Sequence, residues 1–152
     1  MTALTLQQLI PVIQTAVGPV ILISGIGLLL LSMTNRFGRV LDRARLLTSD
    51  LPAATATKRE HLTVQLAILY RRAKIIRLAI ILATASLLLA GLLIISLFLA
   101  ALLQVEAALL VVLCFMLCMA SLIASLVVFL LDLQVSLTAL RVELTQAGFR
   151  EE

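Results

Sequence analysis

The sequence predicts an all-α integral membrane protein whose three transmembrane helices extend into a cytoplasmic helical bundle. Its 152 residues are 62% hydrophobic and 13% charged, whereas soluble domains are about 45–50% apolar and about 25% charged. Residues 1–35 contain no charged side chain, and residues 78–131 contain only Glu106. Because about 20 apolar residues suffice for a helix to cross the hydrocarbon core, the first stretch can cross once and the second twice.

The basic residues predict the orientation of these spans. All twelve lie between Arg36 and Arg77 or from Arg141 onward. Basic loops stay in the cytoplasm, and loops without Lys or Arg are translocated. We therefore expect the N-terminus and the turn at Glu106 outside, and the C-terminus inside. The same clustering just inside the spans favours the lipid bilayer and anionic lipids as partners and argues against nucleic acid, despite the formal charge of +4.

The first predicted span covers residues 9–33, and its helix continues into the cytoplasm over residues 34–50. Pro11 and the Gly18–Pro19 pair lie in the outer half of the span, which we expect to be kinked or split into a separate short helix. The helix should end before Pro52, because the residue before a proline is disfavoured in a helix.

The second predicted helix has a cytoplasmic part over residues 58–74 and a span over residues 75–103. We expect Thr57 to cap its start, with Glu60 completing a capping box. The third predicted helix spans residues 107–131 and extends over residues 132–147. The leucine-rich faces of both extensions should pack with the apolar face of the first helix around Val40 as a small bundle.

Small residues repeat along the second and third spans. In lipid, such seams let helix backbones approach closely, so we interpret them as packing surfaces. The second helix carries Ala79, Ala83, Ser86 and Ala90, and the third carries Cys114, Cys118, Ser121, Ser125 and Asp132. The alternative for the two cysteines, a soft-metal site with Met116 or Met119, has too few strong ligands.

No pattern in the sequence is typical of catalysis. It has no Gly-rich phosphate loop, no nucleophile elbow and no pair of carboxylates within a span, and His61 is its single histidine. Intramembrane chemistry normally requires ionisable groups inside the spans. We therefore expect no enzymatic activity, no cofactor and no metal.

One face of the first helix is small and polar within the span and then becomes basic. It comprises Gln14, Gly18, Gly25, Ser32, Asn35, Arg36, Arg39 and Arg43. Around a symmetry axis this face would line a pore with arginines at its inner mouth and Glu106 at its outer mouth. A 16.4 kDa chain with three spans is too thin to enclose a conduit alone, so this ion-channel hypothesis requires a homo-oligomer. The alternative is a non-conducting scaffold or regulatory subunit whose basic bundle binds anionic lipid or a protein partner.

Asp132 is predicted to pair with a basic residue at the inner membrane boundary. Counted from the turn at Glu106, it lies 26 residues along the third helix, and Arg77 lies 29 residues along the second. These positions differ by only about 4.5 Å in height. Because an unpaired charge at the membrane edge is costly, we expect Arg77 or Arg36 as the partner.

A pattern of seven residues follows the first span directly. Asn-Arg-x-x-Arg-Val-x-Asp-Arg-x-Arg is filled by Asn35, Arg36, Arg39, Val40, Asp42, Arg43 and Arg45. Over residues 12–47 the chain resembles a bacterial family of small multi-span membrane proteins catalogued as domain of unknown function 2721. The resemblance implies this class of protein, its topology and the bacterial inner membrane, and it carries no activity with it.

Overall fold

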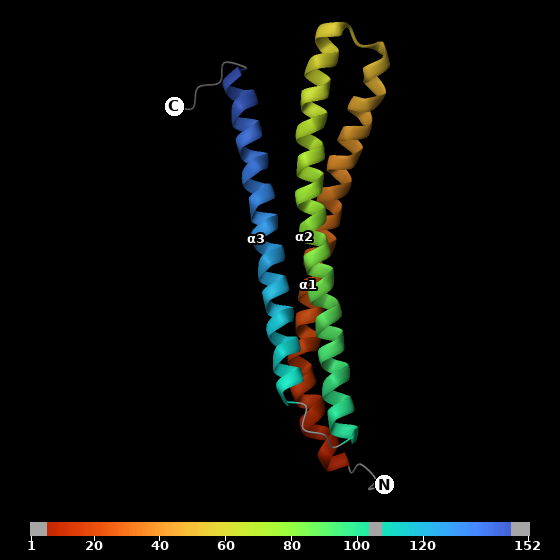
Figure 1. The fold of residues 1–152 in the computed structure, drawn as a ribbon, viewed down its shortest axis with the longest axis vertical. Helices are drawn as coiled ribbons and strands as arrows, with labels where there is room; N and C mark the ends of the chain where they lie inside the picture. Colours follow the sequence, from red (N-terminus) through yellow and green to blue (C-terminus); the bar gives the residue numbers. More distant parts are fainter. Residues whose placement is uncertain (1–5, 104–107, 147–152) are drawn as a thin grey trace. The chain divides into compact units, whose positions relative to one another are not determined.

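The computed structural model describes residues 6–103 and 108–146, with side chains described between residues 10 and 135. These residues form three long helices, α1 (Leu6–Asp50), α2 (Ala56–Leu103) and α3 (Ala108–Gln146), and a short 3₁₀ helix, η1 (Leu51–Ala53), follows α1 (Figure 1). Each long helix contains a segment that is long and apolar enough to cross a membrane. The predicted all-α fold with three candidate spans is therefore confirmed.

Helix α1 continues through both of its prolines, so the separate short helix expected in its outer half does not form. A proline lacks the N–H that would bond the carbonyl four residues earlier, but neighbouring groups can compensate in membrane helices. The hydroxyl of Thr15 donates to the carbonyl of Pro11 at 2.9 Å, and that of Ser24 donates to the carbonyl of Val20 at 3.3 Å. The hydroxyls of Thr15 and Ser24 are thus satisfied by the helix itself.

Helix α2 begins at Ala56, two residues before the predicted start. The backbone N–H of Arg59 donates to the carbonyl of Thr55 at 2.9 Å, which makes Thr55 the residue at the helix start. Thr57 therefore lies inside the helix and does not cap it. The end of α1 at Asp50, just before the proline of η1, agrees with the prediction.

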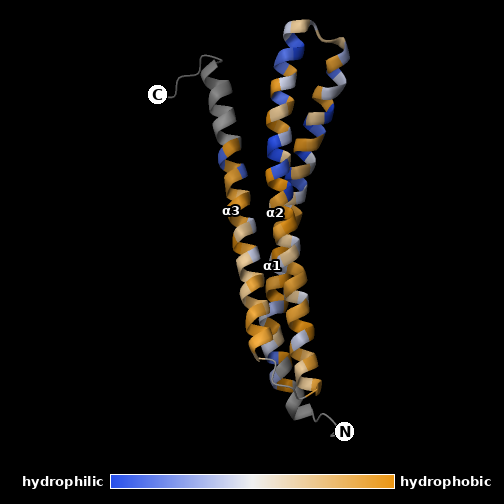
Figure 2. Cartoon of the chain, in the orientation of Figure 1, coloured by the Kyte–Doolittle hydropathy of each residue, from blue (hydrophilic) through white to orange (hydrophobic). Residues whose placement is uncertain are grey.

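The helices contribute to two compact units. Unit one comprises Met1–Ser32 and Ile81–Ala124, and unit two comprises Met33–Ile80 and Ser125–Glu152. In Figure 2 most of the hydrophilic residues fall on the parts of the helices that belong to unit two, above all on α1 and α2, whereas the described part of unit one is mostly apolar.

In unit one, the small residues of α2 and α3 form the predicted seam. Ala83, Ser86 and Ala90 of α2 and Cys118 of α3 are almost completely buried. Side chains this small let the backbones approach, and a hydroxyl can then reach the carbonyl of the neighbouring helix. The hydroxyl of Ser86 donates to the carbonyl of Cys118 at 2.9 Å, and Ser121 donates to the carbonyl of Leu82 at 2.8 Å.

Unit two continues the same type of packing and adds an apolar core. The hydroxyl of Ser125 in α3 donates to the carbonyl of Ala79 in α2 at 2.7 Å, and both residues are fully buried. Val40, Leu69 and Ile76 form a buried cluster between α1 and α2. The contact of these two helices in the expected bundle is therefore present, while the leucine side chains of α3 beyond residue 135 lie outside the described residues.

Candidate functional site: a buried ion cluster and an exposed face of α1

A buried carboxylate in unit two is bound by arginines from the other two helices. The side chain of Asp132 in α3 has no exposed surface. The Nε atom of Arg36 in α1 donates to its Oδ2 atom at 2.8 Å. The Nε atom of Arg72 in α2 lies 3.5 Å from its Oδ1 atom. One ion cluster thus connects all three helices within unit two.

The antiparallel register of α2 and α3 explains why Arg72 takes part. Ser125 contacts Ala79, so Asp132, seven residues further along α3, lies level with the residue seven positions earlier on α2, which is Arg72. Arg77 is five residues from Arg72, about 140° around the helix, and it is exposed. Arg36, one of the two alternatives, makes the contact, so the predicted pairing is confirmed. Arg77 does not take part, and Arg72 is a second partner that was not predicted.

The surroundings of Arg36 hold its guanidinium in a defined position. The Cζ atom lies 5.8 Å from the centroid of the Phe129 ring, which belongs to α3 one turn before Asp132. Only 20% of the Arg36 side chain and 17% of the Arg72 side chain are exposed. Two arginines thus contact one carboxylate. In a site this poorly solvated, the interactions between these charges are screened only weakly.

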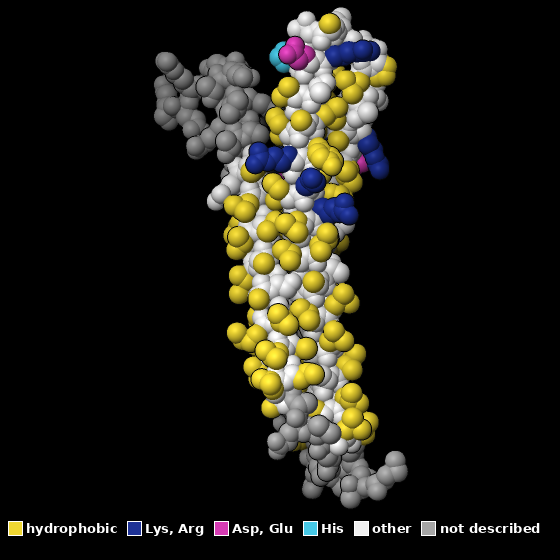
Figure 3. Space-filling model, in the orientation of Figure 1, with side chains coloured by type: hydrophobic (Ala, Val, Ile, Leu, Met, Phe, Trp, Pro, Cys, Tyr) yellow, Lys and Arg dark blue, Asp and Glu magenta, His cyan; other side chains and the backbone are white. Residues whose placement is uncertain are grey.

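Exposed basic side chains surround this cluster on α1 and α2. In Figure 3 they gather over the unit-two parts of these helices. The exposed members are Arg39, Arg43 and Arg45 of α1 and Arg71, Lys74 and Arg77 of α2. Asp42 lies 3.9 Å from Arg45 in a solvent-exposed pair, and the Nζ atom of Lys74 lies 5.5 Å from the centroid of the Tyr70 ring. The result is a strongly basic surface on unit two.

The predicted face of α1 is not covered by the rest of the chain. Seven of its eight members are exposed: Gln14, Gly18, Gly25, Ser32, Asn35, Arg39 and Arg43. A Cβ atom added at Gly18 or Gly25 would meet no atom within 4 Å. The buried side of α1 is formed instead by Ala16, Ile26, Met33 and Val40. Arg36 is the exception, because its contact with Asp132 directs it into unit two. Glu106, the expected outer-mouth residue, lies outside the described residues.

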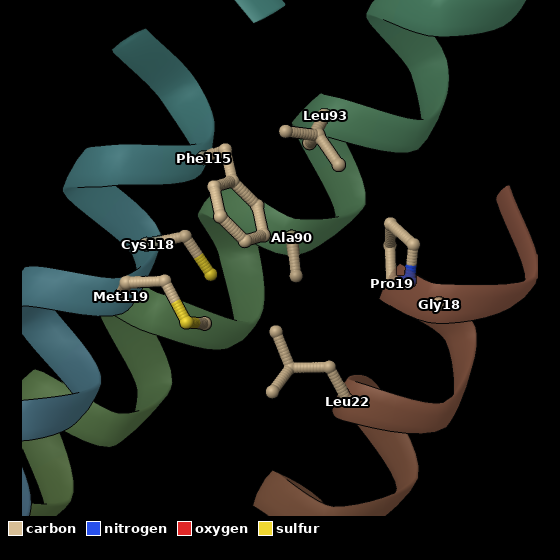
Figure 4. Close-up of a pocket in the computed structure, with 8 residues that line it drawn as sticks. All are labelled: Gly18, Pro19, Leu22, Ala90, Leu93, Phe115, Cys118 and Met119. Carbon is tan, nitrogen blue, oxygen red and sulfur yellow. The ribbon is translucent and has the colours of Figure 1, made fainter. Parts of the chain in front are cut away.

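Unit one contains an apolar pocket of about 290 Å³. It opens where Gly18, Ala90 and Cys118 are too small to fill the space between the three helices (Figure 4). The sulfur atoms of Cys118 and Met119 point toward it. The thiol of Cys118 also lies 3.3 Å from the carbonyl of Ser86, which assigns this cysteine to the α2–α3 seam. Among the described residues, no group of three or more His, Cys, Asp or Glu could hold a metal ion.

Arg72 is the member of the ion cluster that sequence reasoning missed. The signal was present in the seams, because Ser86, Ala79 and Arg72 are spaced by seven residues on α2, as Cys118, Ser125 and Asp132 are on α3. Residues seven apart drift by only about 20° around a helix. Extending both seams by one step would have placed Arg72 opposite Asp132.

A family model extends the resemblance carried by the residues after the first span. The model is described as "Protein of unknown function (DUF2721)" and matches residues 16–142. No curated protein and no solved structure matches the chain. The matched range covers most of the three helices and includes Arg36, Arg72 and Asp132. The chain therefore belongs to the DUF2721 family of proteins of unknown function.

Proposed function

We propose that the protein is a homo-oligomeric ion channel of the bacterial inner membrane, with the exposed face of α1 lining the axis. The observation that carries this proposal is the exposure of Gln14, Gly18, Gly25 and Ser32. The small residues of α2 and α3 make contacts within the chain, such as those of Ser86 and Ser125. The corresponding face of α1 remains available to neighbouring subunits or to water.

The exposure of Gln14 is the strongest reason for an assembly. A side-chain amide in hydrocarbon without a hydrogen-bond partner costs several kcal/mol, on the order of 4–8 kcal/mol on a water-to-alkane scale. A subunit contact or a water-filled path removes most of that cost. Three helices cannot enclose such a path alone, so it would have to be formed by a ring of subunits.

The arginines at the inner end of this face favour anions as the permeant ions. Arg39 and Arg43 are exposed, and a ring of such side chains around an axis attracts anions and repels cations. Arg36 contributes less to this field, because its charge faces Asp132 at 2.8 Å. Arg39 is therefore the residue whose replacement should change selectivity most.

The proposed orientation places the N-terminus outside and unit two in the cytoplasm. We expect a cysteine introduced at Lys58, an exposed position at the start of α2, to be labelled by a membrane-impermeant maleimide only after the cells are opened. A cysteine at Ala108, the first residue of α3, should be labelled in intact spheroplasts. Both variants are made in a background without Cys114 and Cys118. The reverse labelling pattern would refute the orientation.

A second candidate function is a non-conducting scaffold or regulatory subunit, and the basic surface of unit two favours it. Positive charge just inside a membrane binds anionic lipid or an acidic protein surface. The Asp132 cluster would then hold the three helices of unit two together as a platform.

Oligomeric state and ion flux test the two candidates together. The purified protein is analysed by native mass spectrometry and by cross-linking in liposomes, and anion and cation fluxes are measured in the same liposomes. If the protein is a channel, we expect an oligomer that conducts ions, and we expect Arg39→Ala to reduce its preference for anions. A monomer in both detergent and lipid would refute the channel. An oligomer without ion flux would refute the channel and support the non-conducting scaffold.

A further inference from the structure

The geometry of the ion cluster leaves part of the Arg36 guanidinium directed away from Asp132. A guanidinium carries five N–H donors in a rigid plane. Arg36 contacts the carboxylate through Nε at 2.8 Å. The edge formed by its two terminal nitrogens is not used by this contact, and such an edge can bind carboxylate or phosphate oxygens in a fork.

Arg36 is also held in position before any ligand arrives. Its stem is mostly buried, its Nε atom is fixed by the fully buried Asp132, and its plane lies near the Phe129 ring. Ordering a free arginine side chain on binding costs about 0.5–1.5 kcal/mol. Most of this cost has already been met during folding, so the site is preorganised for an anion.

A second arginine lies next to Arg36 on α1. Arg39 follows three residues later and is exposed. Residues at this spacing have Cβ atoms about 5–6 Å apart, so two guanidinium groups can reach one phosphate. Asn35 is exposed beside them and adds amide donors. These groups favour a small, strongly charged anion.

We infer that Arg36 and Arg39 bind the phosphate group of an anionic phospholipid, with Asp132 and Arg72 as positioning residues for Arg36. Arg36 and Arg39 lie three and six residues after Met33, where the apolar part of α1 ends. Basic residues at this level of a membrane protein lie among the phosphates of the cytoplasmic leaflet. The inference rests on the proposed membrane orientation and on the second candidate function, because a channel with the exposed face of α1 on its axis would place Arg39 in the pore and away from lipid.

Phospholipid binding to the purified full-length protein in a mild detergent tests this site. Phosphatidylglycerol is titrated against phosphatidylcholine, and bound lipid is counted by native mass spectrometry while the melting temperature is recorded. We expect phosphatidylglycerol to bind and to raise the melting temperature, and phosphatidylcholine to do neither. Arg39→Gln should weaken phosphatidylglycerol binding about tenfold, as expected for the loss of one charge-assisted hydrogen bond.

Two further variants distinguish a loss of this binding site from a general loss of positive charge and from unfolding. Lys58→Gln removes the same charge at an exposed position in the first turn of α2 and should leave lipid binding within about twofold of the wild type. Arg36→Lys keeps a positive charge beside Asp132 but lacks the fork, so it should lose lipid while it remains folded. Equal binding by Arg39→Gln, Arg36→Lys and Lys58→Gln would overturn the inference.

A competition experiment with inorganic phosphate shows whether the bound phosphate group belongs to a lipid or to free phosphate. Binding to a lipid headgroup predicts that millimolar inorganic phosphate does not displace phosphatidylglycerol, because the lipid tails add affinity that free phosphate lacks. Displacement at that concentration would show that the site binds free phosphate, and it would overturn the assignment to a phospholipid. The assay reads binding alone, so an absence of ion flux or of oligomers would not affect its result.

Discussion

Replacing Asp132 with asparagine is expected to lower the free energy of unfolding by about 3 kcal/mol, the lower end of the range for a buried ion pair that loses one partner. Asparagine has nearly the same volume and keeps one oxygen acceptor, so the change removes mainly the charge. Arg36 and Arg72, both more than three-quarters buried, would then lose the carboxylate that they share. The loss is measured by reversible unfolding of the purified protein in mixed detergent micelles.

Asp42→Asn is the matched control for this prediction. Asp42 also lies near an arginine, Arg45 at 3.9 Å, but both side chains are at least 71% exposed. Exposed pairs on one helix contribute no more than about 0.5 kcal/mol, so this variant should unfold almost like the wild type. If Asp132→Asn and Asp42→Asn unfold alike, the buried cluster does not stabilise the fold.

The sequence predicts the extent of the helices well, because charge and hydropathy decide it. The charge-free stretches are long enough to define the spans, and Pro52 sets the end of α1. The start of α2 is less well determined. Thr55 and Thr57 can both cap a helix, and the sequence around them offers no strong preference between them. The structure selects Thr55, whose carbonyl accepts the first helical bond.

The partner of Asp132 shows why residue counting from a turn is unreliable. The count assumes that α2 ends level with the start of α3. In unit one, the contact between Ser86 and Cys118 instead places Ala108 level with Ser96, seven residues before α2 ends at Leu103. The seams of small residues indicate the register of α2 against α3 directly, because close packing allows only one alignment of these residues.

The face of α1 was predicted as a single arc from Gln14 to Arg43, but Arg36 departs from it. Helical periodicity places the Cα atoms correctly, since the other members are exposed together. It does not determine where a long side chain goes. Arg36 can reach sideways toward α3, and the buried carboxylate of Asp132 draws it there. This tertiary contact connects residues 96 positions apart, which a local pattern cannot reveal.

Replacing Gly25 with leucine is expected to abolish ion flux while the oligomer remains intact. Gly25 lies on the exposed face of α1, and an added Cβ atom would meet no atom of the same chain within 4 Å. The leucine therefore leaves the fold of the subunit unchanged, and its effect reports only on what lies opposite this face in the assembly. Four added carbon atoms from every subunit would fill a narrow path along the axis, so the flux should fall to background. Flux is measured in liposomes, and the oligomer by native mass spectrometry.

Gly27→Leu is the matched control on the same helix. Gly27 is also exposed, with no atom within 4 Å of an added Cβ atom, but it lies about 200° away around α1. The same bulk there should point away from the axis and change neither flux nor assembly. If Gly25→Leu instead dissociates the oligomer, the face is a tight subunit contact, where overpacking costs about 1–3 kcal/mol. That outcome would contradict the pore lining, because a contact closed enough to be broken by one leucine leaves no path for ions beside it.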